Sequence, residues 1–368
     1  MSREQGWYRQ VHRLQVDMTS HCNARCGACI RNIDGGETRA GLSLTHFDVD
    51  VWNRIATVDT KGWWIRELTL NGNWGDTMMH PHLVKMLEVW ITAHPETFIS
   101  IATNGSMRST KFWTDLAKVL RQTAHHKVDF AVDGMEDTHH IYRRKTIFSK
   151  LKENIKAFTD AKGNAVIQMT MFEHNKHQIQ EVKELARELG CRQFNARRSH
   201  SDHMFIKDGD EQYEIKGWYP TGNCEHLIDN ESPEMSEHFE ENDQPMSDIR
   251  DSIWMRVNDK FEELEHKGSC KCPWKDDGNV QIDPWGKVWP CCHISLYGGS
   301  TASNFMNIAK DFDENFLTED LEEAKRQNNL HDNSLGDILK NSFYNYTLEN
   351  AVQNADWNIC KRTCGISK

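Results

Sequence analysis

The sequence predicts an α/β fold in which a partial barrel of six strand–helix units is followed by a small α+β domain. Three observations support this: short apolar runs recur between residues 13 and 199, helix-period segments separate them, and the composition changes after about residue 205. Such alternation is typical of a parallel sheet, and six units are too few for a closed eight-unit barrel. The fold class is therefore a partial (β/α)6 TIM-like barrel, with its ligand site expected at the carboxyl ends of the strands.

The strands and helices of this barrel are predicted from the period of their apolar residues. The strand candidates are short runs rich in β-branched and other apolar residues, and the helix candidates repeat apolar residues every three to four positions. The predicted strands are residues 14–18, 67–70, 99–103, 128–132, 165–171 and 193–196. The predicted helices are residues 83–93, 111–122, 147–161 and 178–189.

An acidic stretch at residues 225–265 separates the barrel from the rest of the chain. We interpret residues 211–268 as a connector or lid with one short helix at residues 253–264. A solvated, disordered insertion is an equally good interpretation, because high charge and few apolar residues give little surface to bury.

The remaining segment, residues 269–368, is predicted to be a small α+β domain that carries cysteines. Residues 280–282 and 287–289 flank the turn residues 283–286, which end in glycine, and this pattern is typical of a β-hairpin. The predicted domains are therefore residues 1–210, 211–268 and 269–368.

Composition excludes several classes of protein. The 368 residues include 44 basic and 55 acidic side chains, a formal charge of −11, which argues against binding to phosphate backbones. No run of about eighteen uncharged apolar residues is present, and the first residues lack a signal-peptide pattern, so we expect a cytoplasmic protein without a membrane partner. In a reducing compartment the 11 cysteines indicate metal ligands or catalytic groups rather than disulfides.

Cys22, Cys26 and Cys29 lie in one loop directly after the first predicted strand. Three thiolates at this spacing suit a [4Fe–4S] cluster better than zinc, because structural zinc takes four ligands in paired short spacings. Three protein ligands leave one iron open to a chelating small molecule. The alternative is three incidental buried cysteines.

The Cys-x3-Cys-x2-Cys pattern formed by Cys22, Cys26 and Cys29 resembles the signature of the radical S-adenosylmethionine (SAM) enzymes, and the likeness extends over most of the chain. The resemblance implies that SAM chelates the open iron and that one electron cleaves it to methionine and a 5′-deoxyadenosyl radical, which abstracts a substrate hydrogen. It also implies a flavodoxin or ferredoxin-type electron donor. One departure is Ala28, which stands where many members carry an aromatic residue.

The segment at residues 71–81 looks like the Gly-Gly-Glu-Pro segment of that family, which binds the SAM ammonium through backbone carbonyls. Gly75 and Asp76 match its second glycine and its acid, whereas Trp74 replaces the first glycine. Glycine lets a backbone approach a ligand closely, and an acid complements a cation. An ordinary strand–helix turn is the alternative.

Five further residues are predicted to contact SAM or substrate. Thr103 and Asn104 resemble the Thr-Asn-Gly segment that lies close to SAM in this family. Asp133 belongs to an Ala-Val-Asp-Gly segment, followed by His139 and Arg143, that is similar to a pattern of peptide-modifying members; capping of the next helix is the alternative. Gln168 on the fifth strand and Arg197 after the sixth are expected to face the barrel interior. Arg197 is expected to pair with the SAM carboxylate, and Arg198 is the alternative for this contact.

The C-terminal cysteines resemble the auxiliary-cluster domains called SPASM and Twitch. Only two cysteines lie late in the chain, so the shorter Twitch version with one auxiliary [4Fe–4S] cluster fits better. The predicted ligands are Cys270, Cys291, Cys360 and Cys364. Cys272 and Cys292 remain alternative ligands, and four cysteines with a hairpin also describe a zinc ribbon.

The resemblance implies a radical SAM enzyme of oxidoreductase or maturase type that oxidises or crosslinks a peptide or protein side chain. Because only 21 residues precede Cys22, a precursor peptide is expected to need a separate helper or a direct groove. The first alternative is a dehydrogenase of a small alcohol, such as a sugar or an aminocyclitol. The second is a non-catalytic iron–sulfur or zinc-binding protein. A nucleic-acid substrate is not expected, given the acidic balance.

Overall fold

The computed structural model describes residues 11–123, 125–199, 203–208, 211–218, 235–238, 272–298 and 324–354. The chain divides into two compact units. The first unit comprises residues 1–17, 40–69 and 244–368, and the second comprises residues 18–39 and 70–243. The predicted domain limits at residues 210 and 268 stay predictions. The predicted lid helix at residues 253–264 lies outside the described residues.

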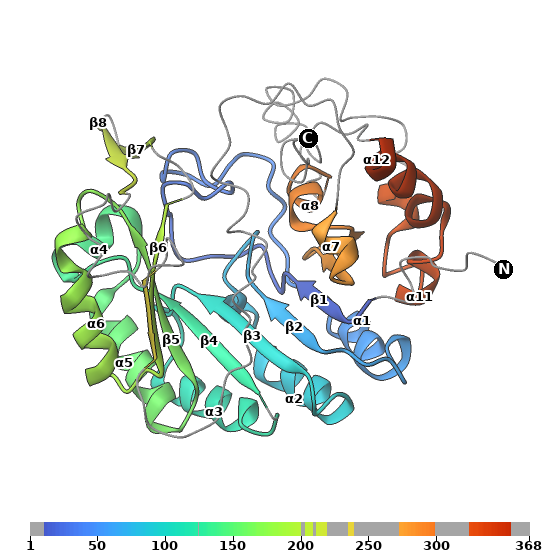
Figure 1. Ribbon diagram of the computed structural model, residues 1–368, viewed down its shortest axis with the longest axis horizontal. Coiled ribbons are helices and arrows are strands. Elements are labelled where there is room, and N and C mark those ends of the chain that lie inside the picture. The colour runs from blue at the N-terminus through green and yellow to red at the C-terminus, as the bar shows by residue number, and fades with distance from the viewer. Residues whose placement is uncertain are drawn as a thin grey trace. The chain divides into compact units, whose positions relative to one another are not determined.

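The second unit contains four consecutive parallel strands with helices between them. The strands pair in chain order: β3 (Phe98–Thr103), β4 (His126–Ala131), β5 (Ala165–Met171) and β6 (Gln193–Arg198). The helices are α2 (Leu83–Ala93), α3 (Thr110–Leu120), α4 (Glu136–Tyr142), α5 (Phe148–Asp160) and α6 (Ile179–Glu188). Figure 1 shows α3, α5 and α6 lying along one side of these strands.

Side chains alternate between the two faces of this sheet, as the two-residue period of a strand requires. Phe130 and Ile167 are fully buried on the face that the helices cover. The opposite face is polar: Lys127 lies 2.9 Å from the Asp129 carboxylate, and Gln168 donates to the same carboxylate at 3.3 Å. The barrel interior of this unit is therefore lined with groups that can bind a polar ligand.

A β-hairpin follows β6 in the chain and packs beside the loop that carries Cys22, Cys26 and Cys29. It consists of β7 (His203–Asp208) and β8 (Glu211–Lys216), and a short strand, β9 (Met235–His238), pairs antiparallel with β6. Ile206 of β7 packs toward the cysteine loop, because a Cβ on Gly27 would lie 2.1 Å from its side chain. Arg144 donates to the Lys207 carbonyl at 3.0 Å.

The first unit joins the beginning of the chain to its last third. β1 (Arg13–Val16) pairs in parallel with β2 (Glu67–Leu70) on one side and with β10 (Asn279–Ile282) on the other. β10 and β11 (Val288–Trp289) form the predicted hairpin, which is confirmed. The buried Asp283 carboxylate shapes its turn, accepting from the backbone of Trp285 and Lys287 and from the Trp289 indole at 2.8–3.0 Å.

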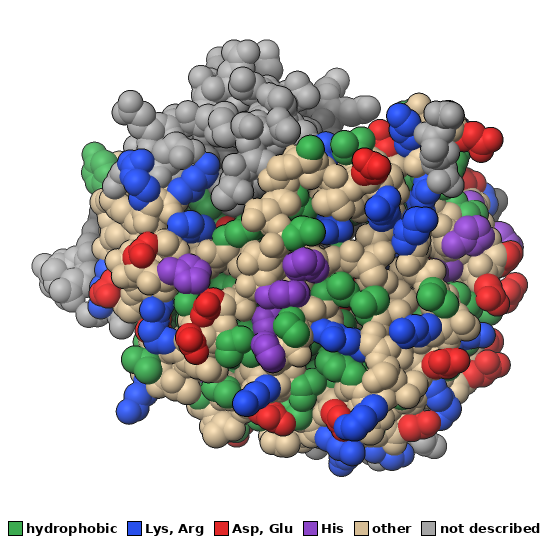
Figure 2. Space-filling model, turned by 180° about the vertical axis from the view of Figure 1, so that it is seen from behind, with side chains coloured by type: hydrophobic (Ala, Val, Ile, Leu, Met, Phe, Trp, Pro, Cys, Tyr) green, Lys and Arg blue, Asp and Glu red, His purple; other side chains and the backbone are tan. Residues whose placement is uncertain are grey.

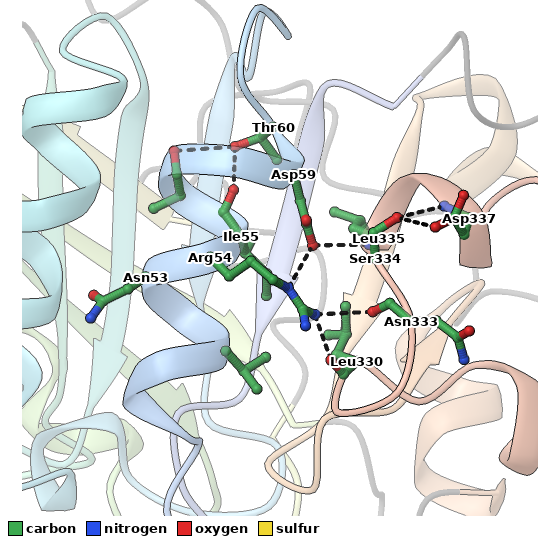
Figure 3. A network of polar contacts seen from close by, with 12 residues as sticks. Asn53, Arg54, Ile55, Asp59, Thr60, Leu330, Asn333, Ser334, Leu335 and Asp337 are labelled. Carbon is green, nitrogen blue, oxygen red and sulfur yellow. Dashed lines mark hydrogen bonds and ion pairs between the residues drawn. The ribbon is translucent and has the colours of Figure 1, made fainter.

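Helices of the first unit are held together by Arg54. The guanidinium donates to the carbonyls of Leu330 and Asn333, and it pairs with Asp59, whose carboxylate also accepts from the Leu335 backbone (Figure 3). These contacts connect α1 (Val49–Arg54) and the π-helical turn after it (Ile55–Asp59) to the start of α11 (Leu335–Ile338). The other helices of this unit are α7 (Pro273–Asp276), α8 (Cys292–Gly298), a second π-helical turn (Phe343–Thr347) and α12 (Leu348–Asn354).

The predicted fold class is confirmed: the described chain is mostly parallel α/β structure, with the strand–helix alternation of a partial (β/α)6 barrel. β2, β5 and α2 have the predicted bounds, and the other predicted strands and helices of the barrel differ by at most two residues at either end. The sequence analysis did not predict α1, α4 or the β7–β8 hairpin.

Two general properties of the described residues bear on partners. None of the described helices is both long enough and apolar enough to cross a membrane. On the face drawn in Figure 2, basic and acidic side chains are interspersed rather than gathered by sign. An even mixture of charge of this kind does not provide the continuous basic stripe that binds a nucleic-acid backbone.

Candidate functional site

The candidate site is the loop that carries the first three cysteines, in the second unit. Cys26 is buried, and Cys22 and Cys29 are half-buried. Successive tight turns shape the loop: the backbone N–H of Cys29 donates to the Cys26 carbonyl at 3.2 Å, and that of Asn32 donates to the Cys29 carbonyl at 2.9 Å. The loop therefore holds three thiols on one short, defined stretch of backbone.

Burial makes all three thiols poor acids in the bare polypeptide. Burial raises the pKa of Cys22 strongly and that of Cys29 to about 11, and the Asp76 carboxylate raises the pKa of Cys22 further. Burial also raises the pKa of Cys26, although the Arg143 guanidinium opposes this. At neutral pH the thiols stay protonated until a cation displaces their protons, which is how iron binding to cysteine proceeds.

The backbone around Gly75 lies directly against the start of the cysteine loop. A Cβ on Gly75 would lie 2.5 Å from the carbonyl oxygens of both Thr19 and His21, so no other residue fits there. The backbone N–H of Asp76 donates to the same His21 carbonyl at 2.9 Å. Glycine is required here by close approach to protein backbone rather than by an unusual φ.

Asp76 joins this segment to the end of β3. The carboxylate accepts hydrogen bonds from the Met78 backbone, the Thr103 hydroxyl, and both the backbone and the side chain of Asn104, at 2.6–3.1 Å. Burial raises its pKa, and these donors oppose the rise. Because four donors already use its two oxygens, Asp76 orients neighbouring residues in this structure, and direct contact with SAM stays a prediction.

Asn104 connects the Asp76 cluster to the cysteines. Its side-chain amide lies 3.9 Å from Cys22 Sγ and donates to Asn23 at 2.9 Å, and its carbonyl oxygen accepts from the Ser106 hydroxyl at 2.8 Å. Ser106 in turn accepts from the Asn23 amide at 2.8 Å. The structure therefore brings four predicted residues together beside the first cysteine: Gly75, Asp76, Thr103 and Asn104.

Asp133 and Arg143 reach the middle cysteine from the other side. Asp133 is fully buried; its carboxylate accepts from Arg143 Nε and from the Thr170 backbone, and its own N–H donates to His139 Nδ1. Arg143 Nη1 donates to Cys26 Sγ at 3.5 Å. Both oxygens of Asp133 are thus engaged by protein donors, and its predicted contact with a ligand hydroxyl stays a prediction.

Gln168 and Arg197 are not part of this hydrogen-bonded group. Gln168 contacts Asp129 on the polar face of the sheet. Arg197, half-buried on β6, pairs in register with Thr170 through its backbone, and its side chain has no hydrogen bond or ion pair to another described residue. A free guanidinium at the carboxyl end of a barrel strand is compatible with the predicted carboxylate contact.

The second cysteine set is described only in part. Cys270, Cys360 and Cys364 lie outside the described residues. Cys291 is buried at the end of the β10–β11 hairpin, and its sulfur accepts from the Ile294 N–H at 3.5 Å. Cys292 is fully buried beside it, and Cys272 is half-buried. The assignment of an auxiliary ligand set stays a prediction.

The donor set of the first loop fits a [4Fe–4S] cluster. Among the described residues, no group of three or more His, Cys, Asp or Glu side chains converges closely enough to hold a single metal ion. A cluster differs from a single ion in this respect, because each thiolate binds its own iron and the three sulfurs need not meet at one point. N–H groups of Ala24, Asn104 and Arg143 are directed at the sulfurs, as cluster sites require.

Sequence analysis missed several residues that shape the site. Arg31 is buried and donates to the carbonyls of Ser20 at 2.9 Å and Trp74 at 3.1 Å, which fastens the cysteine loop to the segment before Gly75. Arg143 was noted only as part of a pattern after Asp133. A buried arginine leaves no periodic signal, so only the pairing of an isolated basic residue with a nearby acid hints at such a contact.

Comparisons with known proteins agree with the chemistry of the loop. Residues 16–186 match the family model of the radical SAM superfamily. The structure is similar to SuiB of Streptococcus suis bound to S-adenosylmethionine (14% identity, 83% of this chain and 66% of that chain, TM-score 0.49). It is also similar to native anSMEcpe with bound AdoMet (14% identity, 90% and 82%, TM-score 0.48) and to BtrN in complex with AdoMet and 2-DOIA (12% identity, 97% and 93%, TM-score 0.43).

The chain therefore spans slightly less than two thirds of the length of SuiB. A comparison with curated protein sequences finds no match.

Proposed function

We propose, from the radical SAM superfamily domain at residues 16–186, that this chain reductively cleaves SAM and uses the resulting radical to oxidise or crosslink a peptide or protein side chain. A single observation supports the proposal most strongly: three thiols on one loop are surrounded by N–H donors from Ala24, Asn104 and Arg143. A bound [4Fe–4S] cluster would supply the one electron that cleaves SAM to methionine and a 5′-deoxyadenosyl radical, and that radical would take the substrate hydrogen.

In this proposal, different residues of the chain hold the cluster and orient its surroundings. Cys22, Cys26 and Cys29 hold the cluster, and three ligands leave one iron for SAM. Asn104 orients the first cysteine, and Gly75 lets the neighbouring backbone approach the loop closely enough to present carbonyl groups. These groups are preorganised by hydrogen bonds within the protein, so binding SAM costs little rearrangement.

For SAM itself we propose contacts from both sides of the site. Backbone carbonyls near Gly75 face the ammonium, Thr103 and Asn104 line the adenosine side, and Gln168 lies on the polar inner face. Arg197, which lacks a polar partner among the described residues, pairs with a carboxylate in this proposal. Asp133 supports the site through Arg143.

The polar inner face of the second unit supports a second candidate function, oxidation of a small alcohol such as a sugar or an aminocyclitol. Lys127, Asp129 and Gln168 form a connected polar row there, and Gln193 donates to Asn195 at 2.7 Å on the next strand but one. Hydroxyl groups of a polyol satisfy such a row as well as peptide amides do. A non-catalytic iron–sulfur or zinc-binding protein remains the alternative outside enzyme chemistry.

An auxiliary [4Fe–4S] cluster belongs to the same proposal. Removing one hydrogen atom leaves a substrate radical, and a two-electron oxidation is complete only when that radical loses a further electron and a proton. A second cluster bound by Cys270, Cys291, Cys360 and Cys364 would accept that electron. A flavodoxin or ferredoxin-type protein would supply the electron that starts the reaction.

The proposal is tested first on anaerobically reconstituted protein. Iron and sulfide are counted, the protein is reduced with dithionite, SAM is added, and 5′-deoxyadenosine is measured, with Cys26→Ala as the control. About eight irons per chain are expected for two clusters, and about four for the first alone. Protein that carries a full complement of iron and forms no 5′-deoxyadenosine, with or without candidate substrates, would contradict the proposal.

The substrate class is tested by mass. The active enzyme is incubated with a peptide library and, separately, with a library of sugars and aminocyclitols, and products lighter by two hydrogens are sought. Loss of two hydrogens in a peptide supports the main proposal, and loss from a polyol supports the second candidate. If protein with its full iron content cleaves SAM but changes no member of either library, both substrate classes are excluded.

A further inference from the structure

We propose that Arg143 is a positioning residue that sets the reduction potential of the cluster held by the Cys22–Cys26–Cys29 loop. The inference rests on the proposed function, because it presupposes a cluster on these three cysteines. It assigns Arg143 a task beyond holding the loop together: its charged N–H group stabilises the extra negative charge that arrives when the cluster takes up one electron.

The geometry places the guanidinium at the sulfur of the middle cysteine. Arg143 Nη1 donates to Cys26 Sγ at 3.5 Å while Nε of the same guanidinium donates to Asp133. A planar guanidinium can hold two acceptors at once in fixed directions, which the single ammonium of a lysine does not do. Arg143 is therefore aimed at Cys26 by its own contact with Asp133.

Asp133 is itself held in place by three contacts. Its carboxylate accepts a hydrogen bond from the Thr170 backbone on β5. Its backbone N–H donates to His139 on α4, and its backbone carbonyl accepts from the Asn175 side chain at 3.1 Å. None of these contacts depends on the cysteine loop. Contacts outside the cysteine loop therefore fix Asp133, and through it the direction of the Arg143 guanidinium, before any cluster is bound.

Burial makes this contact electrostatically effective. The Arg143 side chain is 18% exposed and that of Asp133 is fully buried, so water screens the guanidinium only weakly. The pair is close to neutral overall, but the guanidinium lies between the carboxylate and the sulfur and presents its N–H to Cys26. A hydrogen bond donated by a cation favours the more negative state of its acceptor. Reduction of the cluster by one electron is the step that increases negative charge at this sulfur.

The test measures the one-electron midpoint potential of the cluster, not turnover. Dithionite supplies the electron in an anaerobic redox titration that is followed by electron paramagnetic resonance. Each variant is measured twice, once with Cys291 intact and once with Cys291→Ala added, so that in the second case the signal comes from the first cluster alone. For Arg143→Gln we expect the equilibrium constant of reduction to fall about tenfold, which corresponds to about 59 mV for one electron. Arg143→Lys, which keeps the charge without the fork, is expected to fall between the two.

Arg144→Gln is the matched control, because it removes the same charge from the next residue, whose side chain donates to the Lys207 carbonyl. Its potential is expected to equal that of the wild type. A shift as large as that of Arg143→Gln would reduce the effect to general charge, and an unchanged potential in Arg143→Gln would remove Arg143 from the tuning of the cluster; either result overturns the inference.

A second readout covers a variant that loads poorly. If Arg143→Gln binds less iron, Arg143→Lys is compared with the wild type at equal iron content, and the iron–sulfur stretching frequencies are recorded by resonance Raman spectroscopy. Loss of an N–H···S contact shifts these frequencies and lowers the potential; absence of both changes overturns the inference. Wild-type protein without a cluster would overturn the proposed function itself, whereas a wild-type cluster that is insensitive to Arg143 overturns this inference alone.

Discussion

The two cysteine regions of the chain, the loop with Cys22, Cys26 and Cys29 and the hairpin end with Cys291 and Cys292, differ in the groups that contact their sulfur atoms. In the loop of the second unit, Cys22 receives the Asn104 amide and Cys26 receives the Arg143 guanidinium. In the first unit, the Cys291 sulfur accepts a hydrogen bond from a backbone N–H, and the pKa of Cys292 is raised mainly by burial, with further contributions from Cys291 and Asp17. A guanidinium and a side-chain amide from distant parts of the chain therefore reach the sulfurs of the first set, whereas the hydrogen bond described for Cys291 comes from the backbone of the adjacent helix α8.

This difference shows that a cysteine pattern alone does not define a cluster site. The side chains that make the first loop suitable for negatively charged sulfur come from the ends of β3 and α4, distant in sequence from the cysteines. The second set lies on a hairpin whose own polar group, Asp283, is used to shape its turn. Variants in each region can separate the two roles.

The largest expected effect on SAM cleavage and iron content comes from replacing one cysteine by alanine in each region. Cys26→Ala should abolish 5′-deoxyadenosine formation, because a cluster with two protein ligands does not present its open iron to SAM. Cys291→Ala should retain SAM cleavage and lose about four irons per chain, the content of one auxiliary cluster. Iron, sulfide and 5′-deoxyadenosine are measured on both. Equal loss of SAM cleavage in the two variants would erase the distinction between the regions.

Gly75→Ala tests whether close approach of backbone builds the first region. The added Cβ would meet two carbonyl oxygens at 2.5 Å, so the segment must move away from the cysteine loop. We expect SAM cleavage to fall about 100-fold, the cost of roughly an ångström of misplacement at a reacting group. Gly36→Ala is the control, since its Cβ would meet only the Ile33 and Lys207 carbonyls at 3.0 and 3.7 Å. Equal rates in the two variants would contradict the expectation.

Asp76→Asn tests the contact between the cysteine loop and β3. The amide replaces one carboxylate oxygen by a donor, so at least one of the contacts from Thr103 and Asn104 is lost. Loss of such an outer contact costs about 10–100-fold in activity or metal affinity. Iron content and the SAM dependence of cleavage are measured. Asp129→Asn, on the polar face away from these contacts, should leave iron content unchanged.

The smallest expected effect concerns pH and the second region. Burial raises the pKa of Asp283 from 3.8 to about 7, and the Trp289 indole and backbone donors oppose this. The native state therefore holds a proton that the unfolded state releases between pH 4 and 7, so stability falls as pH rises through this window by up to about 1.4 kcal/mol per pH unit. The stability difference between wild type and Asp283→Asn, from anaerobic denaturant titrations at pH 5.5 and 8, should change with pH. A difference that stays constant would contradict the raised pKa.

Much of the barrel follows from local pattern. β2, β5 and α2 have the predicted bounds because strong apolar periods define them. The β7–β8 hairpin was missed because its strands alternate charged residues with a few apolar ones, and the apolar face is buried by tertiary contacts with Phe172, neighbouring residues and the cysteine loop. α4 is too short for its period to be recognised.

The site was predicted to a similar depth. The cysteine spacing predicts three cluster ligands, which stays a prediction, and the motif resemblance places Asp76 and Asn104 near these cysteines, as the structure does. The contact of Arg143 with Cys26 was beyond sequence analysis, because it depends on how the end of α4 turns back toward the loop. The pairing of β10 with β1 was equally inaccessible, since nothing local in either strand specifies a partner so far along the chain.

That pairing has a consequence for how the polypeptide emerges during synthesis. β1 is made first, but its neighbour on one side, β10, follows only after more than 260 residues, since Arg13 pairs with Asn279. Until then one row of β1 backbone groups has no strand to pair with, and an unpaired strand edge invites pairing with other chains. The Arg54 contacts to Leu330 and Asn333 form later still. The strands of the first unit can therefore pair fully only after β10 and β11 have been made, and the edge of β1 stays open to pairing with other chains until then.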